Sequence, residues 1–187
     1  MRSPFAALAA TLTLVVPASA LAAPNEPAGI TVSVERGANG THVTGRFSID
    51  ASVDAAWSTL TDYDGISRFV TSIKDSHLRP GPVVEQRMTG RIGSFAKRIY
   101  VALAIDESPK RSIAFQDFSR RSFDRYAGSW TIEPGKDGLT VVYELEAEPR
   151  FFVPSFIAGP AFRDSVQVLL AQVREEILRR ARSPGNS

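Results

Sequence analysis

The strongest constraint on the fold is a series of short segments in which apolar and polar residues alternate. After residue 70, five such segments are separated by turn residues, with a spacing that suits antiparallel neighbours. We expect strands at 84–92, 99–105, 113–117, 126–132 and 139–145. In each strand, period two places the apolar side chains on one face. The sequence therefore predicts a sheet that is apolar on one face only.

A long amphipathic helix is predicted after these strands, from residue 161 to about 181. Its apolar stripe recurs at helical spacing and consists of Phe162, Val166, Leu169, Val173 and Ile177, widened by Leu170 and Leu178. Residues 149–160 contain three prolines and three phenylalanines, and we expect no regular element there. One apolar helix facing one apolar sheet predicts an α+β fold.

The N-terminal third is expected to form a hairpin followed by two short helices. Residues 30–35 and 42–49 alternate, and Asn39-Gly40 between them is a strong signal for a two-residue turn. Residues 53–60 carry apolar side chains at helical spacing, and Ser52 is placed to cap that helix. Turn residues at 62–65 end it, and 66–70 supply a second short apolar patch.

The first 22 residues have the outline of a secretory signal peptide. Arg2 precedes an apolar run over 5–16, and small residues at 18–22 suit cleavage. We expect residues 23–29 to be a flexible N-terminus, 30–182 a single domain, and 183–187 a disordered tail. The mature protein is then expected in the periplasm if the host has an outer membrane, and outside the cell otherwise.

Composition excludes several classes of partner and chemistry. Removing residues 1–22 takes away Arg2 and no acidic residue, so 22 basic residues become 21 against 20 acidic ones, and net charge favours no partner. No aromatic platform or basic helix accompanies the basic residues between 87 and 125, so we expect no nucleic acid. The 187 residues include no cysteine, which excludes thiol catalysis and Cys-ligated metals.

No catalytic or metal-binding pattern emerges from the polar residues. His42 and His77 belong to no triad, and we read both as surface residues. Asp62 and Asp64 flank Tyr63 in a tight turn, where carboxylates usually serve the turn. Asp117 ends a strand at an inward position, and we expect it to pair with a nearby arginine. We therefore expect no metal and no cofactor.

Three stretches of the chain resemble one protein family. Residues 51–70, ASVDAAWSTLTDYDGISRFV, resemble the first helical segment of the START-like, polyketide cyclase/dehydrase (SRPBCC) superfamily, and the coenzyme-Q-binding START-domain family is the most similar-looking branch. Residues 128–134 and 138–144 agree with this resemblance, which spans roughly residues 43–180 in order. It implies a helix-grip fold, in which a curved antiparallel sheet wraps around a long C-terminal helix, with two short helices after the N-terminal strands.

The aromatic pattern alone is more typical of a filled core, but the resemblance implies an elongated apolar cavity between helix and sheet. The candidate ligand-binding residues are Trp57, Phe69, Met88, Phe115, Tyr126, Trp130, Tyr143, Phe162, Val166 and Leu170. The tyrosines could supply orienting hydroxyl groups. Phe151, Phe152 and Phe156 either plug the end of the core or form a lid or membrane-touching rim at a candidate entrance.

Three functions are consistent with this sequence. The first is an exported, non-catalytic protein that binds or carries a hydrophobic small molecule such as a lipid, a quinone or an isoprenoid, with transient membrane contact. The second is an aromatase/cyclase- or dehydrase-type enzyme that acts on a polyketide-like substrate in the same cavity. The third is an envelope interaction scaffold without a ligand, which a contiguous exposed apolar patch would favour. The oligomeric state is left open.

Overall fold

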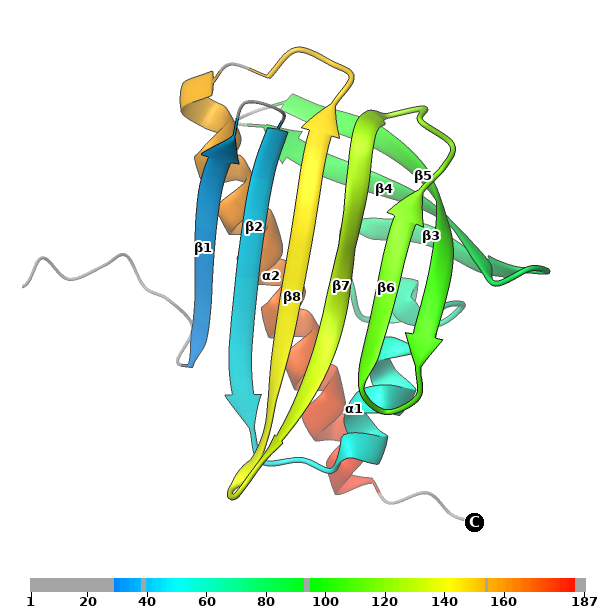
Figure 1. Cartoon of the computed structure of the whole chain (residues 1–187), viewed down its shortest axis with the longest axis vertical. Helices are drawn as coiled ribbons and strands as arrows, with labels where there is room; N and C mark the ends of the chain where they lie inside the picture. Colours follow the sequence, from blue (N-terminus) through cyan, green and yellow to red (C-terminus); the bar gives the residue numbers. More distant parts are fainter. Residues whose placement is uncertain (1–28, 38–39, 93–94, 154, 184–187) are drawn as a thin grey trace, which may run out of the picture.

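The computed structural model describes residues 29–37, 40–92, 95–153 and 155–183 (Figure 1). Within these residues, eight antiparallel strands form one curved sheet in the order β1-β2-β8-β7-β6-β5-β4-β3. The elements are β1 (Ile30–Gly37), β2 (Gly40–Ile49), α1 (Val53–Leu60), the 3-10 helix η1 (Ile66–Arg68), β3 (Ile73–Arg79), β4 (Val83–Ile92), β5 (Phe95–Ser108), β6 (Ser112–Asp117), β7 (Phe123–Gly135), β8 (Gly138–Pro149) and α2 (Ser155–Arg182). The sheet lies in front of the long helix α2 in Figure 1, which confirms the helix-grip fold. The expected signal peptide (residues 1–22), residues 23–28 and residues 184–187 lie outside the described residues.

The first hairpin and the first helix form where the sequence predicts them. β1 and β2 pair in antiparallel register from Ile30 opposite Phe47 to Gly37 opposite Gly40. Ser52 caps α1, because its hydroxyl accepts a hydrogen bond from the Ala55 amide at 3.1 Å. The cap satisfies one backbone N–H group that the first turn would otherwise leave unpaired.

β3 is a strand that the alternation rule does not reveal. Only Ile73 and Ser76 are buried in it, three positions apart, because the register to β4 shifts between Ile73 and Asp75. Such an irregularity breaks the two-residue period on which the prediction depends. β3 forms one edge of the sheet, and β1 forms the other.

α2 begins six residues earlier than predicted, at Ser155. The prediction that residues 149–160 lack a regular element is therefore wrong for 155–160. Pro160 is the sixth residue of the helix, just beyond the first four amide groups, which have no intrahelical acceptor in any case. A proline at this position removes only one early hydrogen bond of the ladder.

The core lies between α2 and the inner face of the sheet. Val166, Leu170, Val173 and Ile177 on α2 are at most 3% exposed, at helical spacing. Gly45 on β2 allows the close approach, because a Cβ atom there would lie 2.5 Å from Leu170 Cδ1. The helix therefore packs directly on β1 and β2, whereas a space remains between it and the other half of the sheet.

A polar cluster, made of Ser58, Asp62, Glu176, Arg179 and Arg180, ties the C-terminal end of α2 to α1 and the turn after it. The Arg180 guanidinium donates to Asp62 at 2.6 Å, to Glu176 at 2.7 Å and to the Ser58 carbonyl at 2.8 Å. Hydrogen bonds from Arg179 outweigh burial and, with those from Arg180, lower the pKa of Glu176 to about 2. Burial pushes the pKa of Asp62 upward, but its arginine partners hold it below the usual value. The cluster therefore keeps both carboxylates ionised.

Candidate ligand-binding site

An apolar cavity of about 210 Å³ lies between α2 and the inner face of strands β4 to β8. Seven of the ten predicted ligand-binding residues border it: Met88, Phe115, Tyr126, Trp130, Tyr143, Phe162 and Val166. The strand residues reach it because every second side chain of a strand points to the same face. On β5 the lining runs from Lys97 to Ile105, about 26 Å along the strand at 3.3 Å per residue, so the cavity is elongated.

Aromatic rings form much of the sheet side of this cavity. Trp130 and Tyr143 are opposite each other on β7 and β8, with ring centroids 4.5 Å apart. Phe115 lies 6.0 Å from Tyr126, whose ring is in turn 4.8 Å from Phe123. These distances are typical of attractive, tilted aromatic pairs, which hold one another in fixed orientations. The cavity is thus walled by preorganised rings.

Three predicted residues lie elsewhere, which corrects that part of the prediction. Trp57 is half-buried and packs on the core without bordering the cavity. Phe69 borders a separate surface pocket beside the end of α2, where the Arg180 guanidinium lies 5.7 Å from its ring centroid. Leu170 is fully buried against β2 and fills the space that Gly45 leaves. Leu60, Tyr63 and Ile66 close that end of the cavity instead.

Further lining residues were missed, among them Lys97 and Phe123. Both lie just outside the strand ranges that the sequence predicted, since β5 begins at Phe95 and β7 at Phe123. Lys97 lies two residues before Ile99, so its side chain is on the same inward face of β5 as those of Ile99 and Val101. Extending the two-residue period past the apolar run would have found it, but a lysine normally marks the end of an apolar face.

Two phenol groups bring polarity into the cavity. Burial raises the pKa of Tyr126; its interaction with the Tyr143 hydroxyl partly offsets this, and the charge of Asp117 adds to it. Burial, with the neighbouring Tyr126, raises the pKa of Tyr143 well above its usual value. Both phenols are therefore protonated at neutral pH. Since Tyr143 donates to Tyr126, the Tyr126 hydroxyl is the one that can donate a hydrogen bond to a bound molecule.

Asp117 does not form the expected salt bridge with an arginine. Its Oδ1 atom accepts hydrogen bonds from the Ala102 and Ser119 amides, each at 2.9 Å, and so fixes the turn after β6. Its Oδ2 atom is buried and has no hydrogen-bond partner within the described residues. The side chain does not border the cavity, so it is not placed to exchange a proton with a ligand there.

Of the other two candidate carboxylates, Asp62 serves the turn as predicted, because its Oδ1 atom accepts from the Gly65 amide at 3.0 Å. Asp64 differs from the prediction, because its Oδ1 atom accepts from the Leu78 amide of β3 at 2.9 Å. The hydroxyl of Tyr63, between them, donates to Glu107 at 2.6 Å. These bonds fix η1 and β3 beside the cavity. The arrangement can hold an apolar molecule and orient a polar group on it, and the described residues place no carboxylate pair inside.

At the start of α2 the lining of the cavity includes the exposed Lys97 and the half-buried Phe151 and Val153, and we take this end as the mouth. Phe151 borders the cavity, with its ring centroid 6.3 Å from that of Phe123. Phe152 is 89% exposed and points away from the core. The side chain of Phe156 lies outside the described residues. The alternative that all three phenylalanines plug the end of the core is therefore wrong for Phe152, and an entrance at this segment stays a prediction.

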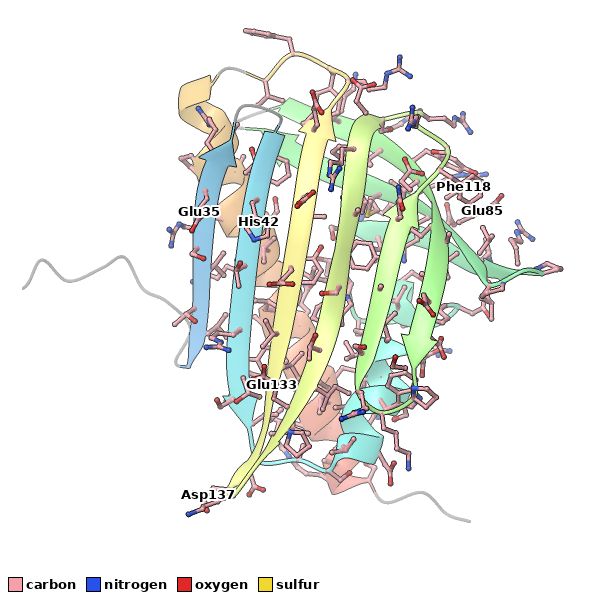
Figure 2. The ribbon with its side chains drawn as sticks, in the orientation of Figure 1. Glu35, His42, Glu85, Phe118, Glu133 and Asp137 are labelled. Carbon is pink, nitrogen blue, oxygen red and sulfur yellow. The ribbon has the colours of Figure 1, made fainter. Side chains whose placement is uncertain are left out.

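Exposed apolar side chains do not gather in one place. The large ones in the described part of the chain are Leu78, Phe118, Phe152 and Val168, and they come from four different segments. Phe118 directly follows β6, and Figure 2 shows Glu35 and His42 on adjacent strands of the face turned away from α2. Over residues 29–183, apart from the gaps given above, we find no helix with the length and apolarity needed to cross a bilayer.

The sequence matches one known protein family over most of its length. The family described as polyketide cyclase/dehydrase and lipid transport matches residues 40–180. No curated protein sequence is similar enough to count as a match.

Solved structures share the fold. A STAR-related lipid transfer protein from Xanthomonas axonopodis is 16% identical, with a TM-score of 0.67 over 83% of this chain and 97% of that one. The Zhui aromatase/cyclase from Streptomyces sp. R1128 is 17% identical, with a TM-score of 0.62 over 78% and 98%. Human StAR-related lipid transfer protein 5 is 9% identical, with a TM-score of 0.66 over 83% and 85%.

Proposed function

The chain belongs to the polyketide cyclase/dehydrase and lipid transport family, and from this premise we propose that it is an exported, non-catalytic protein that binds or carries a hydrophobic small molecule. The observation that carries the proposal is the elongated apolar cavity lined by Phe115, Trp130 and Phe162. Burying an apolar molecule against such walls is favourable by about 25 cal/mol per Å². Lipid, quinone and isoprenoid-like compounds have the matching chemistry, and coenzyme Q is the specific quinone that the sequence resemblance suggests.

The size of the cavity limits what it holds at rest. An apolar cavity of about 150 Å³ accepts benzene, so 210 Å³ accommodates a group of roughly eight carbon atoms without rearrangement. A longer chain needs the first turns of α2 or the segment after β8 to move. Residues 158–165 are suited to this, because none of them is fully buried.

Native mass spectrometry of the mature protein, purified from the export compartment of its own host, tests the proposal. We expect a stoichiometric hydrophobic adduct that solvent extraction identifies. Phe162→Glu should remove the adduct, because it places a charge against the cavity. Val168→Glu is the matched control: it adds the same charge on the same helix, at a side chain that is 51% exposed. A protein that carries and takes up no hydrophobic compound would refute the proposal.

We further propose that the mouth contacts a membrane transiently when the ligand is exchanged. Phe152 supports this, because a phenylalanine that is 89% exposed beside the mouth can insert into the interface of a bilayer. Phe152→Ser should weaken cosedimentation with vesicles of phosphatidylethanolamine and phosphatidylglycerol. Phe118→Ser, at a residue that is 58% exposed and does not border the cavity, should leave it unchanged. Equal effects of the two variants would contradict the proposal.

Export of the protein is also part of the proposal and rests on the pattern of residues 1–22. Intact mass and N-terminal sequencing of the protein from its host should show a chain that begins close to residue 23. A chain that retains Met1 or Arg2 and fractionates with the cytoplasm would contradict it.

A second candidate function is a cyclase-type enzyme, and the paired phenols favour it. Tyr126 and Tyr143 form a protonated, mutually bonded pair inside an apolar cavity, where the Tyr126 hydroxyl could orient a carbonyl group of a reactive chain. Cyclised product from a synthetic poly-β-ketone, formed by the wild type and lost in the Tyr126→Phe, Tyr143→Phe double variant, would support this function. Equal rates with and without protein would exclude it for that substrate.

A further inference from the structure

Lys97 is the charged residue that borders the cavity. Of the lining side chains in the described part of the chain, it alone carries a full charge at neutral pH. It lies near the start of β5, opposite Gly90 on β4, with its side chain at the mouth. A lysine here can extend its apolar stem along the cavity wall while the ammonium group stays in water.

The Lys97 ammonium group has no carboxylate partner among the described residues. Its partner is the ring of Phe151, with the nitrogen 5.1 Å from the ring centroid. Some cations in or beside the sheet do have a carboxylate partner: Lys110 pairs with Asp54 at 2.6 Å, Arg150 with Asp124 at 3.1 Å, and Arg125 with Glu146. At an exposed site a cation is held only weakly by an aromatic face, and its remaining N–H donors stay open to an anion.

The charge at the mouth is not compensated from within the cavity. Asp117, the nearest inward-facing carboxylate of the adjacent strand, is paired with Leu103, six residues along β5 from Lys97. That separation is about 20 Å at 3.3 Å per residue. The lining between the two is largely apolar, so one end of the elongated cavity is cationic and the rest is uncharged.

From this polarity we infer that the ligand is a single-headed amphiphile with an anionic head group, a carboxylate or a phosphate, that binds Lys97 at the mouth while its chain lies in the cavity. The inference rests on the proposed binding function and narrows it to one chemical class. A neutral compound of the same length would gain the apolar contacts but not the charge-assisted hydrogen bond.

Calorimetric titration with four ten-carbon probes tests the inference: decanoate, monodecyl phosphate, 1-decanol and decylammonium. We expect at least one anionic probe to bind the wild type about tenfold more tightly than 1-decanol, and the tighter of the two anions identifies the head group. Lys97→Met should remove that preference and leave 1-decanol within twofold. Arg98→Met is the matched control, because it removes the same charge one residue along, on the opposite face of β5.

Charge reversal provides a second test. Lys97→Glu should bind decylammonium about tenfold more tightly than decanoate, and thermal unfolding checks that each variant is folded. If 1-decanol binds the wild type as tightly as both anions, or if Arg98→Met weakens anion binding as much as Lys97→Met does, the inference is wrong while the proposed function stands. If none of the four probes binds, the proposed function itself fails for chains of this length.

Discussion

Replacing Arg180 with alanine tests how firmly the end of α2 is held. The guanidinium makes charged hydrogen bonds to Asp62 and Glu176 and a third to the Ser58 carbonyl. Its side chain is 21% exposed, so water screens these bonds only in part. Each carboxylate keeps other partners in the variant, because Arg68 and the Gly65 amide still reach Asp62, and Arg179 still reaches Glu176.

We therefore expect each carboxylate to lose one charge-assisted bond worth about 1.5 kcal/mol, the lower end for charged groups, or about 3 kcal/mol together. For a domain of this size, about 3 kcal/mol corresponds to a fall of roughly 6–12 °C in Tm. Arg179→Ala is the control, because Arg179 bonds the same Glu176 from a side chain that is 63% exposed. An exposed pair of this kind contributes about 1 kcal/mol or less.

The difference in Tm between the wild type and Arg180→Ala depends on pH through the pKa of Glu176. Its folded value of about 2 lies below the ordinary 4.5, so its contribution is complete above about pH 4.5 and is lost as the pH falls toward 2. Thermal unfolding followed by circular dichroism at pH 7 and at pH 3 should show a smaller gap between wild type and Arg180→Ala at the lower pH. If Arg180→Ala and Arg179→Ala unfold at the same temperature at pH 7, the argument from the cluster is wrong.

Two other results are expected. Because the pKa values of Tyr63, Tyr126 and Tyr143 are raised, absorbance at 295 nm between pH 9 and 10.5 should rise less in the native protein than in urea, where all four tyrosines titrate. The same shifts, being upward, predict that stability falls above about pH 10. A full native titration would contradict this. Asp117→Ala should lower the free energy of unfolding in urea by about 2–4 kcal/mol, because it leaves the Ala102 and Ser119 amides without their acceptor. Asp117→Asn keeps the Oδ1 acceptor and should lower it much less. Equal losses in the two variants would show that the charge, not the acceptor, matters.

The parts of the fold that depend on local patterns were predictable from the sequence. The cap at Ser52, the hairpin of β1 and β2 and the apolar face of β4 to β8 all follow from rules that operate over a few residues. β3 was not predicted, because a register shift spaced its buried residues three apart. The start of α2 was not predicted, because Pro160 was read as a helix breaker, although a proline in the early turns of a helix removes only one backbone hydrogen bond.

The candidate site was harder to predict, because periodicity tells which side chains face inward but not what they meet there. Phe115 and Leu170 both face the interior, yet Phe115 borders the cavity while Leu170 packs against Gly45. That difference depends on how closely α2 approaches each half of the sheet, which is a long-range property. Lys97 was not predicted for another reason: a charged side chain on the inward face contradicts the apolar pattern by which that face is recognised.

The uneven packing of α2 predicts an order of local opening. Val166, Leu170, Val173 and Ile177 bury the helix from its middle onward, and the Arg180 contacts fix its last turns, whereas residues 158–165 are only half-buried or exposed. Segments with few buried contacts open at lower free-energy cost than the whole domain does. Amide hydrogen exchange should therefore be fast at the N-terminal turns of α2 and slow near Ile177. A molecule held in the cavity, in contact with Phe162, would slow exchange in those early turns first, so exchange rates there can report occupancy before the ligand is identified.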